Sequence, residues 1–178
     1  MARGMKWAAL LSLLITLLFS VLYLIGLHWA FAVAITFGTF FYHFAMRLMV
    51  GHSINRKMQN RADYRKTWYQ LRPFENRLYR ILKVKKWKGH MPTYDPSCFN
   101  PKLHSWEEIA QAMCQAEIVH EVIIVLSFLP LLAAIPFGSF FVFLITSLLS
   151  AMYDLSFVII QRFNRPRIIK LIKKERVV

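Results

Sequence analysis

Two long tracts without charge limit what this chain can fold into. Residues 7–46 contain no Lys, Arg, Asp or Glu, and residues 122–161 contain only Asp154. Each tract is 40 residues long. A helix crosses the hydrocarbon layer of a bilayer with about 20 apolar residues, so each tract is long enough to cross twice with a turn between. The pattern predicts an all-α polytopic membrane protein with four transmembrane helices arranged as two hairpins.

The expected spans form one membrane domain, residues 1–178. They lie at about 7–26, 29–50, 113–135 and 139–161. The first six residues and the apolar run after them look like a signal peptide, but the run is too long for one and a second span follows at once. We therefore expect the first span to be retained.

The cations of the chain predict its orientation. All 23 Lys and Arg residues lie outside the two tracts, and short cationic flanks stay in the cytoplasm. The basic segment 51–105, the basic tail 162–178 and both termini are therefore expected on the cytoplasmic face of the cell membrane. Cys98 and Cys114 fall on that side, where thiols stay reduced.

The net charge of +14 and the pI of about 10.2 raise the question of nucleic acid. These cations border membrane spans, however, where each is attracted to anionic headgroups by about 1 kcal/mol. We expect membrane lipids with anionic headgroups as partners, and no nucleic acid.

The cytoplasmic segment carries its own helix signals. Leu78, Ile81, Leu82 and Trp87 alternate with Arg and Lys, a pattern typical of an amphipathic helix lying in the headgroup layer. Ser105-Trp106-Glu107-Glu108 has the spacing of a capping box and predicts the start of the helix that leads into span three. Pro130 is expected to kink that helix, and Arg47 is expected to snorkel to the inner membrane surface.

Five ionisable residues are expected in the inner half of the membrane. Glu117, His120 and Glu121 share one helix face at i, i+3 and i+4, while His43 and Asp154 lie near the inner ends of spans two and four. Such residues are functional candidates by default. A carboxylate beside an imidazole suits a general base that takes a proton from a hydroxyl. The alternative is that they only hydrogen-bond between helices or contact headgroups.

Two further chemistries remain open. Glu117 and His120 match Glu-x-x-His, the helical element of di-iron bundles, which need that motif twice. This chain has it once, although Asp154 or His43 would complete a smaller metal site. Cys114 is a conceivable acyl-carrying nucleophile, but an inert buried thiol is the simpler interpretation.

The segment after span four concentrates donors for an anion. Arg162, Arg165 and Arg167 stand beside Gln161 and Asn164, and guanidinium groups bind phosphate through paired hydrogen bonds. The alternative is an ordinary cationic stop-transfer anchor. The choice of Arg with two amides favours recognition.

Three blocks of sequence resemble a known family. They are Lys86-Trp87-Lys88 followed by Pro92, the run from Cys114 to His120, and the run from Ile160 to Arg167. In this order and spacing the chain resembles the glycosyl-4,4'-diaponeurosporenoate acyltransferases, small membrane proteins of carotenoid glycolipid biosynthesis. The resemblance implies transfer of a fatty acyl group to a sugar hydroxyl of a membrane lipid. Gly89 and Glu121 depart from residues common in that family.

Together these observations predict a membrane acyltransferase. The acyl donor is expected to be a thioester, acyl-CoA or acyl carrier protein, with no other cofactor required, and the acceptor a lipid-linked sugar. His120 is the expected general base and Glu117 its orienting partner. The remaining substrate-binding candidates are Lys86, Trp87, Lys88, Gln161, Arg162, Asn164, Arg165 and Arg167. A metal-dependent lipid enzyme and a non-catalytic lipid-binding scaffold are the alternatives.

Overall fold

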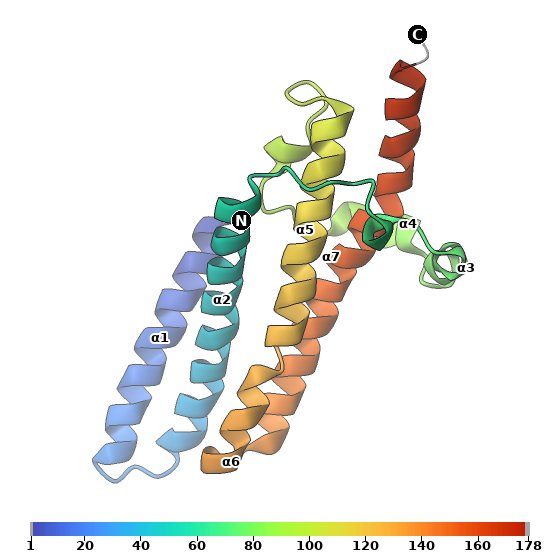
Figure 1. Ribbon diagram of the computed structural model, residues 1–178. Coiled ribbons are helices and arrows are strands. Elements are labelled where there is room, and N and C mark those ends of the chain that lie inside the picture. Colours follow the sequence, from blue (N-terminus) through green and yellow to red (C-terminus); the bar gives the residue numbers. More distant parts are fainter. Residues whose placement is uncertain (1, 177–178) are drawn as a thin grey trace. The chain divides into compact units, whose positions relative to one another are not determined.

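The computed structural model describes residues 2–176, which form helices and turns without a strand. Within residues 2–176, four α-helices are long and three are short, as labelled in Figure 1. The long ones are α1 (Ala2–Leu24), α2 (Ala30–Met58), α5 (Trp106–Leu126) and α7 (Phe140–Glu175). The short ones are α3 (Pro73–Ile81), α4 (Val84–Trp87) and α6 (Ala134–Phe137). Single 3-10 turns lie at Thr67–Tyr69, Lys88–His90, Pro96–Phe99 and Leu129–Ala133.

Four helical stretches are long and apolar enough to cross a membrane. They are Arg3–Leu24, Ala30–Met58, Trp106–Phe137 and Phe140–Glu175. This confirms the prediction of an all-α polytopic membrane protein with four spans. Large apolar side chains such as Leu14, Leu18 and Ile145 are exposed on these helices, as lipid contact requires.

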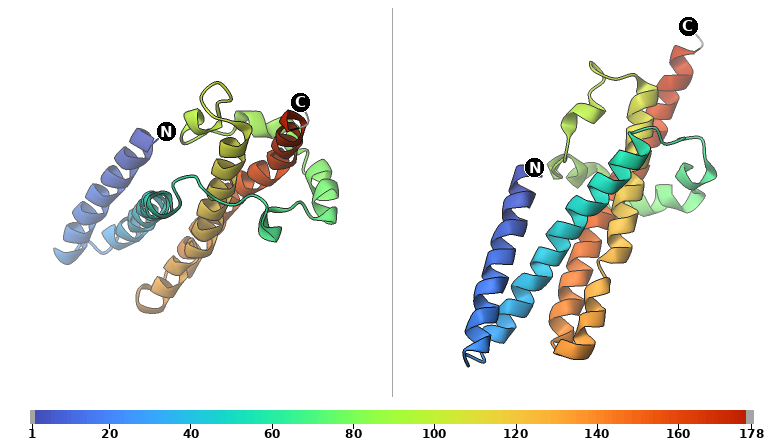
Figure 2. Two further views of the ribbon diagram at one scale, coloured as in Figure 1. Left: turned by 45° about the horizontal axis from the view of Figure 1, so that its top comes forward. Right: turned by 60° about the vertical axis from the view of Figure 1, so that its left-hand side comes forward.

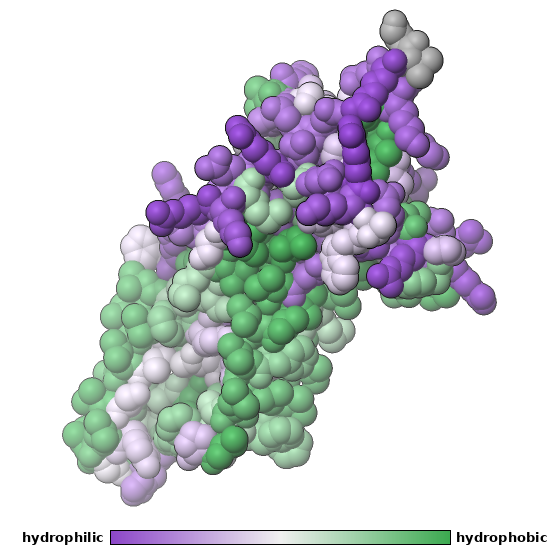
Figure 3. Space-filling view, viewed as in Figure 1, coloured by the Kyte–Doolittle hydropathy of each residue, from purple (hydrophilic) through white to green (hydrophobic). Residues whose placement is uncertain are grey.

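The described residues divide into two compact units. The first contains residues 2–52 and 122–154, and the second contains residues 53–121 and 155–176. The single membrane domain stays a prediction. On the face drawn in Figure 3, hydrophobic side chains cover most of the first unit, whereas the second unit is mainly hydrophilic.

The first hairpin of the first unit is formed by α1 and α2, which run beside each other in both views of Figure 2. The chain reverses at Gly26, whose φ of +102° few other residues adopt. The rings of Tyr23 and Phe31 pack together across the turn, with their centres 5.1 Å apart. A side chain at Gly38 would meet Thr16 at 3.4 Å, so the two helices approach closely there.

The second hairpin of the first unit turns at Gly138, which has φ +67° and ψ −135°. Before it, the chain breaks where Pro130 was expected to kink the helix. The α5 helix ends at Leu126, and Leu129–Ala133 forms a 3-10 turn, because proline provides no N–H for the next helical hydrogen bond.

In the second unit the basic amphipathic segment differs from its prediction. It consists of two short helices instead of one, because Lys83 adopts a left-handed conformation (φ 49°, ψ 38°) that ends α3 and starts α4. Phe74, Leu78 and Ile81 of α3 are exposed, which agrees with a position in the headgroup layer.

The capping box that starts α5 is confirmed. The backbone N–H of Ser105 donates to the Glu108 carboxylate at 2.8 Å, and the Glu108 N–H donates to the Ser105 hydroxyl at 3.3 Å.

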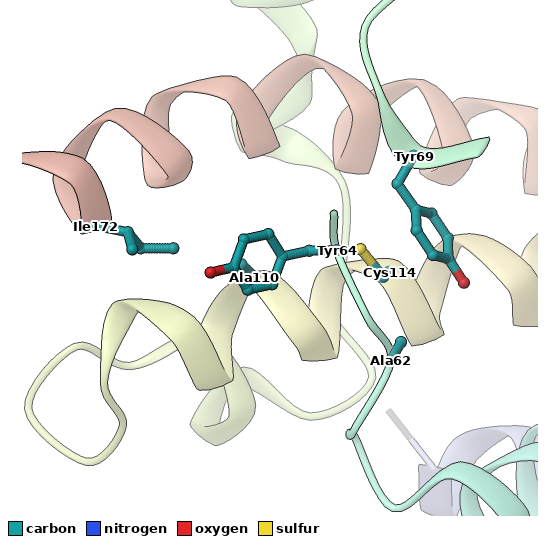
Figure 4. Close-up of a cluster of buried hydrophobic side chains, with 6 residues drawn as sticks. All are labelled: Ala62, Tyr64, Tyr69, Ala110, Cys114 and Ile172. Carbon is teal, nitrogen blue, oxygen red and sulfur yellow. The ribbon is translucent and has the colours of Figure 1, made fainter. Parts of the chain in front are cut away.

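A small buried core holds the second unit together. Tyr64 and Tyr69, from the segment that follows α2, flank Cys114 of α5, and Ile172 of α7 completes the cluster (Figure 4). Gln115 of α5 is bonded both to this segment and to the end of α2. Its side chain accepts from the Asn60 N–H at 2.7 Å and donates to Asn55 of α2 at 3.0 Å.

The α7 helix continues past residue 161, where the fourth span was expected to end, and reaches Glu175. Pro166 lies inside it and removes the helical hydrogen bond to the Arg162 carbonyl. Before this position Arg162 and Arg165 form ion pairs with buried carboxylates, and after it Ile172 packs in the buried core. Such tertiary contacts override a weak local preference.

Candidate functional site

Glu117 lies at the centre of a buried ion-pair network in the second unit. Its side chain is fully buried, and its two carboxylate oxygens are bonded by two arginines of α7. Arg162 donates from Nη1 to one oxygen at 2.7 Å. Arg165, only 1% exposed, donates from Nη2 to the other.

Arg162 joins Glu117 to a second carboxylate, that of Glu75 on α3. The guanidinium donates to Glu75 from Nε at 2.9 Å and from Nη2 at 2.5 Å, the two-pronged geometry that suits Arg and carboxylate. It also donates to the backbone carbonyls of Trp68 and Gln70, both at 3.0 Å. Every nitrogen of this guanidinium therefore donates to a group of the protein.

Glu75 accepts two further hydrogen bonds. Tyr79, one turn along α3, donates its hydroxyl to the carboxylate, and the Arg72 N–H donates to it at 3.1 Å. Burial alone would raise the pKa of Glu75, but the hydrogen bonds from Arg162, Tyr79 and Arg72 outweigh it and lower that pKa. Burial and the neighbouring carboxylate raise the pKa of Tyr79.

The charges of this network balance, with two carboxylates against two guanidinium groups. Arg165 also donates to the Tyr69 carbonyl at 2.8 Å and stacks over the Tyr69 ring, 5.1 Å from its centre. Both arginines are thus engaged by protein groups, which fits an internal brace for α3, α5 and α7 better than the phosphate site expected from the sequence.

His120 lies one turn after Glu117 on α5 and is partly buried. Its ring stacks on Phe157 of α7, with ring centres 4.6 Å apart and planes 10° from parallel. Glu121, the next residue, accepts a hydrogen bond from the Trp68 indole at 3.0 Å. The three residues of the predicted face therefore have separate surroundings: arginines at Glu117, an aromatic ring at His120 and an indole at Glu121.

A second group of polar residues surrounds Phe163 on α7. Lys88 lies 5.0 Å above its ring and Arg167 lies 4.9 Å from it. Lys88 also donates to the Asn164 side chain at 2.5 Å. Burial, and then the nearby charges of Arg167 and Lys85, lower the pKa of Lys88. Among residues 2–176 neither cation has a carboxylate partner, and two cations held this close make a suitable place for an anion.

The other predicted substrate-binding residues lie outside these two groups. Lys86 is exposed, and Trp87 donates its indole N–H to the Leu82 carbonyl at 2.9 Å, which steadies the turn between α3 and α4. Gln161 is partly buried on α7.

In the first unit, Asp154 forms an ion pair with Arg47. Arg47 donates to the Asp154 carboxylate from Nε at 3.1 Å and from Nη2 at 2.5 Å, and its side chain is only 12% exposed. The expectation that Arg47 snorkels to the membrane surface is therefore wrong, because a carboxylate inside the helix bundle holds it. His43, one turn before Arg47 on α2, is 5% exposed.

Among residues 2–176, no three His, Cys, Asp or Glu side chains come together in a group that could hold a metal ion. Both oxygens of Glu117 are occupied by arginine. Cys114 is completely buried in the core of the second unit, away from attack by a substrate.

Three residues of these ion-pair networks, Glu75, Tyr79 and Arg47, were not among the site residues predicted from the sequence. The chain has only nine acidic residues against 23 basic ones, so a carboxylate such as Glu75 within a basic segment was itself a signal of a buried partner. Tyr79 at i+4 from Glu75 adds to that signal. The partner of Arg47 lies more than a hundred residues along the chain, and periodicity cannot find it.

The sequence model described as glycosyl-4,4'-diaponeurosporenoate acyltransferase matches residues 65–174. This range contains Glu75, Lys88, Glu117, His120 and the arginines of α7. No curated protein and no solved structure matches the chain.

Proposed function

This chain belongs to the glycosyl-4,4'-diaponeurosporenoate acyltransferase family, and from that premise we propose that it moves a fatty acyl group from a thioester to a sugar hydroxyl of a glycosylated, carotenoid-type membrane lipid. The family is one of acyltransferases, and the four apolar helices make this member an integral membrane enzyme. The observation that carries the proposal is the match over residues 65–174, which spans the whole network of Glu75, Glu117, Arg162 and Arg165.

His120 is the proposed general base. Its imidazole takes the proton of the sugar hydroxyl while the hydroxyl oxygen forms a bond to the thioester carbonyl carbon. The carbon–sulfur bond then breaks, and the leaving thiolate receives that proton from the imidazolium. Stacking on Phe157 supports this role, because it fixes the plane of the imidazole ring.

Glu117 acts in this proposal as a positioning residue. Its oxygens are taken by Arg162 and Arg165, so it serves His120 through the helix that they share. Anchoring α5 to α7 one turn from His120 holds the imidazole where a bound hydroxyl meets it, and such placement contributes to the rate.

Lys88 and Arg167 are the proposed contacts for the phosphates of the acyl donor, with Lys86 nearby in sequence. Unlike Arg162 and Arg165, they have no carboxylate within the ion pairs of the described residues. Phe163 between them offers a flat apolar surface. With both termini and the basic segment on the cytoplasmic face, these cations meet a donor supplied from the cytosol.

The experiment compares lipid extracts of cells that carry the wild-type chain or His120→Ala, together with the glycosylated lipid precursor. The variant should lower formation of the acylated lipid by about 10² to 10⁴ fold, the usual contribution of a general base. His52→Ala, which changes an exposed histidine on α2, is the matched control and should retain activity. Normal acylation by correctly folded His120→Ala would exclude the mechanism, and no acylated lipid from the wild type would exclude the function.

A further inference from the structure

A cavity of about 680 Å³ lies within the first unit, between α1, α2 and α7. Ligand pockets commonly measure about 300 to 1,000 Å³, so it has room for a small molecule or a lipid chain. Its walls are mainly apolar, with Met5 and Ala8 from α1, Phe40 and Phe44 from α2, and Leu149 from α7. The residues that line it have no role in the proposed mechanism so far.

One buried polar side chain lines this apolar cavity without a partner. His43 is 5% exposed, and within residues 2–176 neither of its ring nitrogens has a hydrogen-bond partner. A neutral imidazole has one N–H donor and one acceptor nitrogen. Leaving a buried donor unpaired costs free energy, and buried donors without partners are rare in proteins. His43 therefore indicates a ligand that supplies an oxygen.

The charge beside His43 is already balanced. Arg47 donates to the Asp154 carboxylate, to the Ser150 hydroxyl at 2.8 Å and to the backbone carbonyl of His43 at 3.1 Å. Because the guanidinium has its counterion within the protein, no excess positive charge remains to hold a carboxylate or a phosphate at this depth. The oxygen that His43 meets should belong to an uncharged group.

We propose that this cavity binds a long-chain acyl ester or thioester, with the His43 N–H donating to its carbonyl oxygen and the apolar chain lying along Phe40, Phe44 and Leu149. An acyl carbonyl is uncharged and accepts a hydrogen bond, and it is attached to a chain that matches apolar walls inside a membrane span. The site follows from the geometry of the first unit alone, while its use by a substrate of the reaction rests on the proposed function.

Two molecules carry this chemistry: the acyl thioester donor and a neutral ester of a membrane lipid. The probe is a long-chain fatty acid methyl ester that bears a diazirine on its chain, added to the full-length protein in detergent and activated by light. Peptide mass spectrometry should place the saturable label on residues 40–47 and 146–153. Competition with palmitoyl-CoA and with unlabelled methyl palmitate identifies the source, and free palmitate should compete less than the ester.

Three variants test the assignment. Ala8→Phe fills the cavity from α1 and should abolish the saturable label. His43→Leu removes one hydrogen bond and should weaken binding of the probe by about 2- to 10-fold. Ala32→Phe adds the same ring to α2 at an exposed position outside the cavity and should bind like the wild type.

The proposal is overturned if the label falls outside both segments, if free palmitate competes as well as the ester, or if Ala8→Phe binds the probe like Ala32→Phe. Should His43→Leu fail to fold, the position of the label and the Ala8→Phe variant still test whether the cavity binds the probe. Because His120→Ala should still take up the probe, labelling without acyl transfer would leave the cavity site standing while the proposed function fails.

Discussion

Glu117 of α5 and Arg165 of α7 form an ion pair in which the side chains are 0% and 1% exposed. With Arg162 and Glu75 the pair makes a balanced network that joins α3, α5 and α7 inside the second unit. Breaking a buried pair costs more than the pair contributes, because it leaves the partner charged and unsolvated. Loss of any one of these four side chains should therefore lower the stability of the fold.

Glu117→Ala should lower the free energy of unfolding by about 3 to 5 kcal/mol, since it leaves two guanidinium groups without their carboxylate. Thermal unfolding of the purified protein in detergent measures the loss. Glu107→Ala is the matched control, because Glu107 pairs with Arg176 at an exposed position and its removal should change little. Equal stability of the two variants would mean that the Glu117 network does not brace the fold.

Stability should fall in acid through Glu75. Its pKa is lowered in the folded protein, so its contribution is complete above the unfolded value of about 4.3 and is lost as pH falls through the folded value. The thermal midpoint of the wild type should drop steeply below about pH 4.3. Glu75→Gln should begin less stable at pH 7 and lose less in acid; an unchanged acid profile in this variant would assign the pH dependence to another group.

Removing Lys88 or Arg167 should weaken binding of the acyl donor. Each variant, Lys88→Met and Arg167→Met, should raise the KM for acyl-CoA about 10-fold while kcat changes little, because a charge-assisted bond holds substrate and transition state alike. Steady-state kinetics in detergent measures both constants. Lys102→Met changes an exposed lysine in the same basic segment and should behave as the wild type. A fall in kcat alone would place these cations at the reacting atoms.

Cys98 reports the orientation of the protein. It is partly exposed in the basic segment, whereas Cys114 is fully buried. A membrane-impermeant maleimide should therefore label one thiol in inside-out vesicles and none in intact cells, and Cys98→Ser should abolish labelling. Burial and then the Asp95 carboxylate raise the pKa of the Cys98 thiol, so labelling should accelerate as pH rises. Labelling of intact cells would reverse the predicted topology.

The fold was largely predictable because its main signals are local. Two uncharged tracts set the four long helices, Ser105 and Glu108 set the start of α5, and Pro130 marks the end of its regular hydrogen bonding. The left-handed turn at Lys83 was not predicted, because lysine has no preference for that conformation and a continuous amphipathic pattern runs through it.

The candidate site was only partly predictable. Periodicity placed Glu117 and His120 on one side of a helix, and the structure keeps them one turn apart. It could not say which neighbour each would meet, and Glu117 lies against arginines 45 and 48 residues away in sequence. Arg162 and Arg165 were selected for their guanidinium groups, but their partners are carboxylates of the protein itself.

The ion pairs also show how much of the positive charge the protein balances itself. They occupy Glu75, Glu107, Glu117 and Asp154, four of the nine acidic residues, against 23 cations in all. Most of the positive surplus must therefore find its counterions outside the polypeptide, and a bilayer of neutral lipids offers none. We therefore expect the thermal midpoint of the protein in uncharged detergent to rise when a lipid with an anionic headgroup is added.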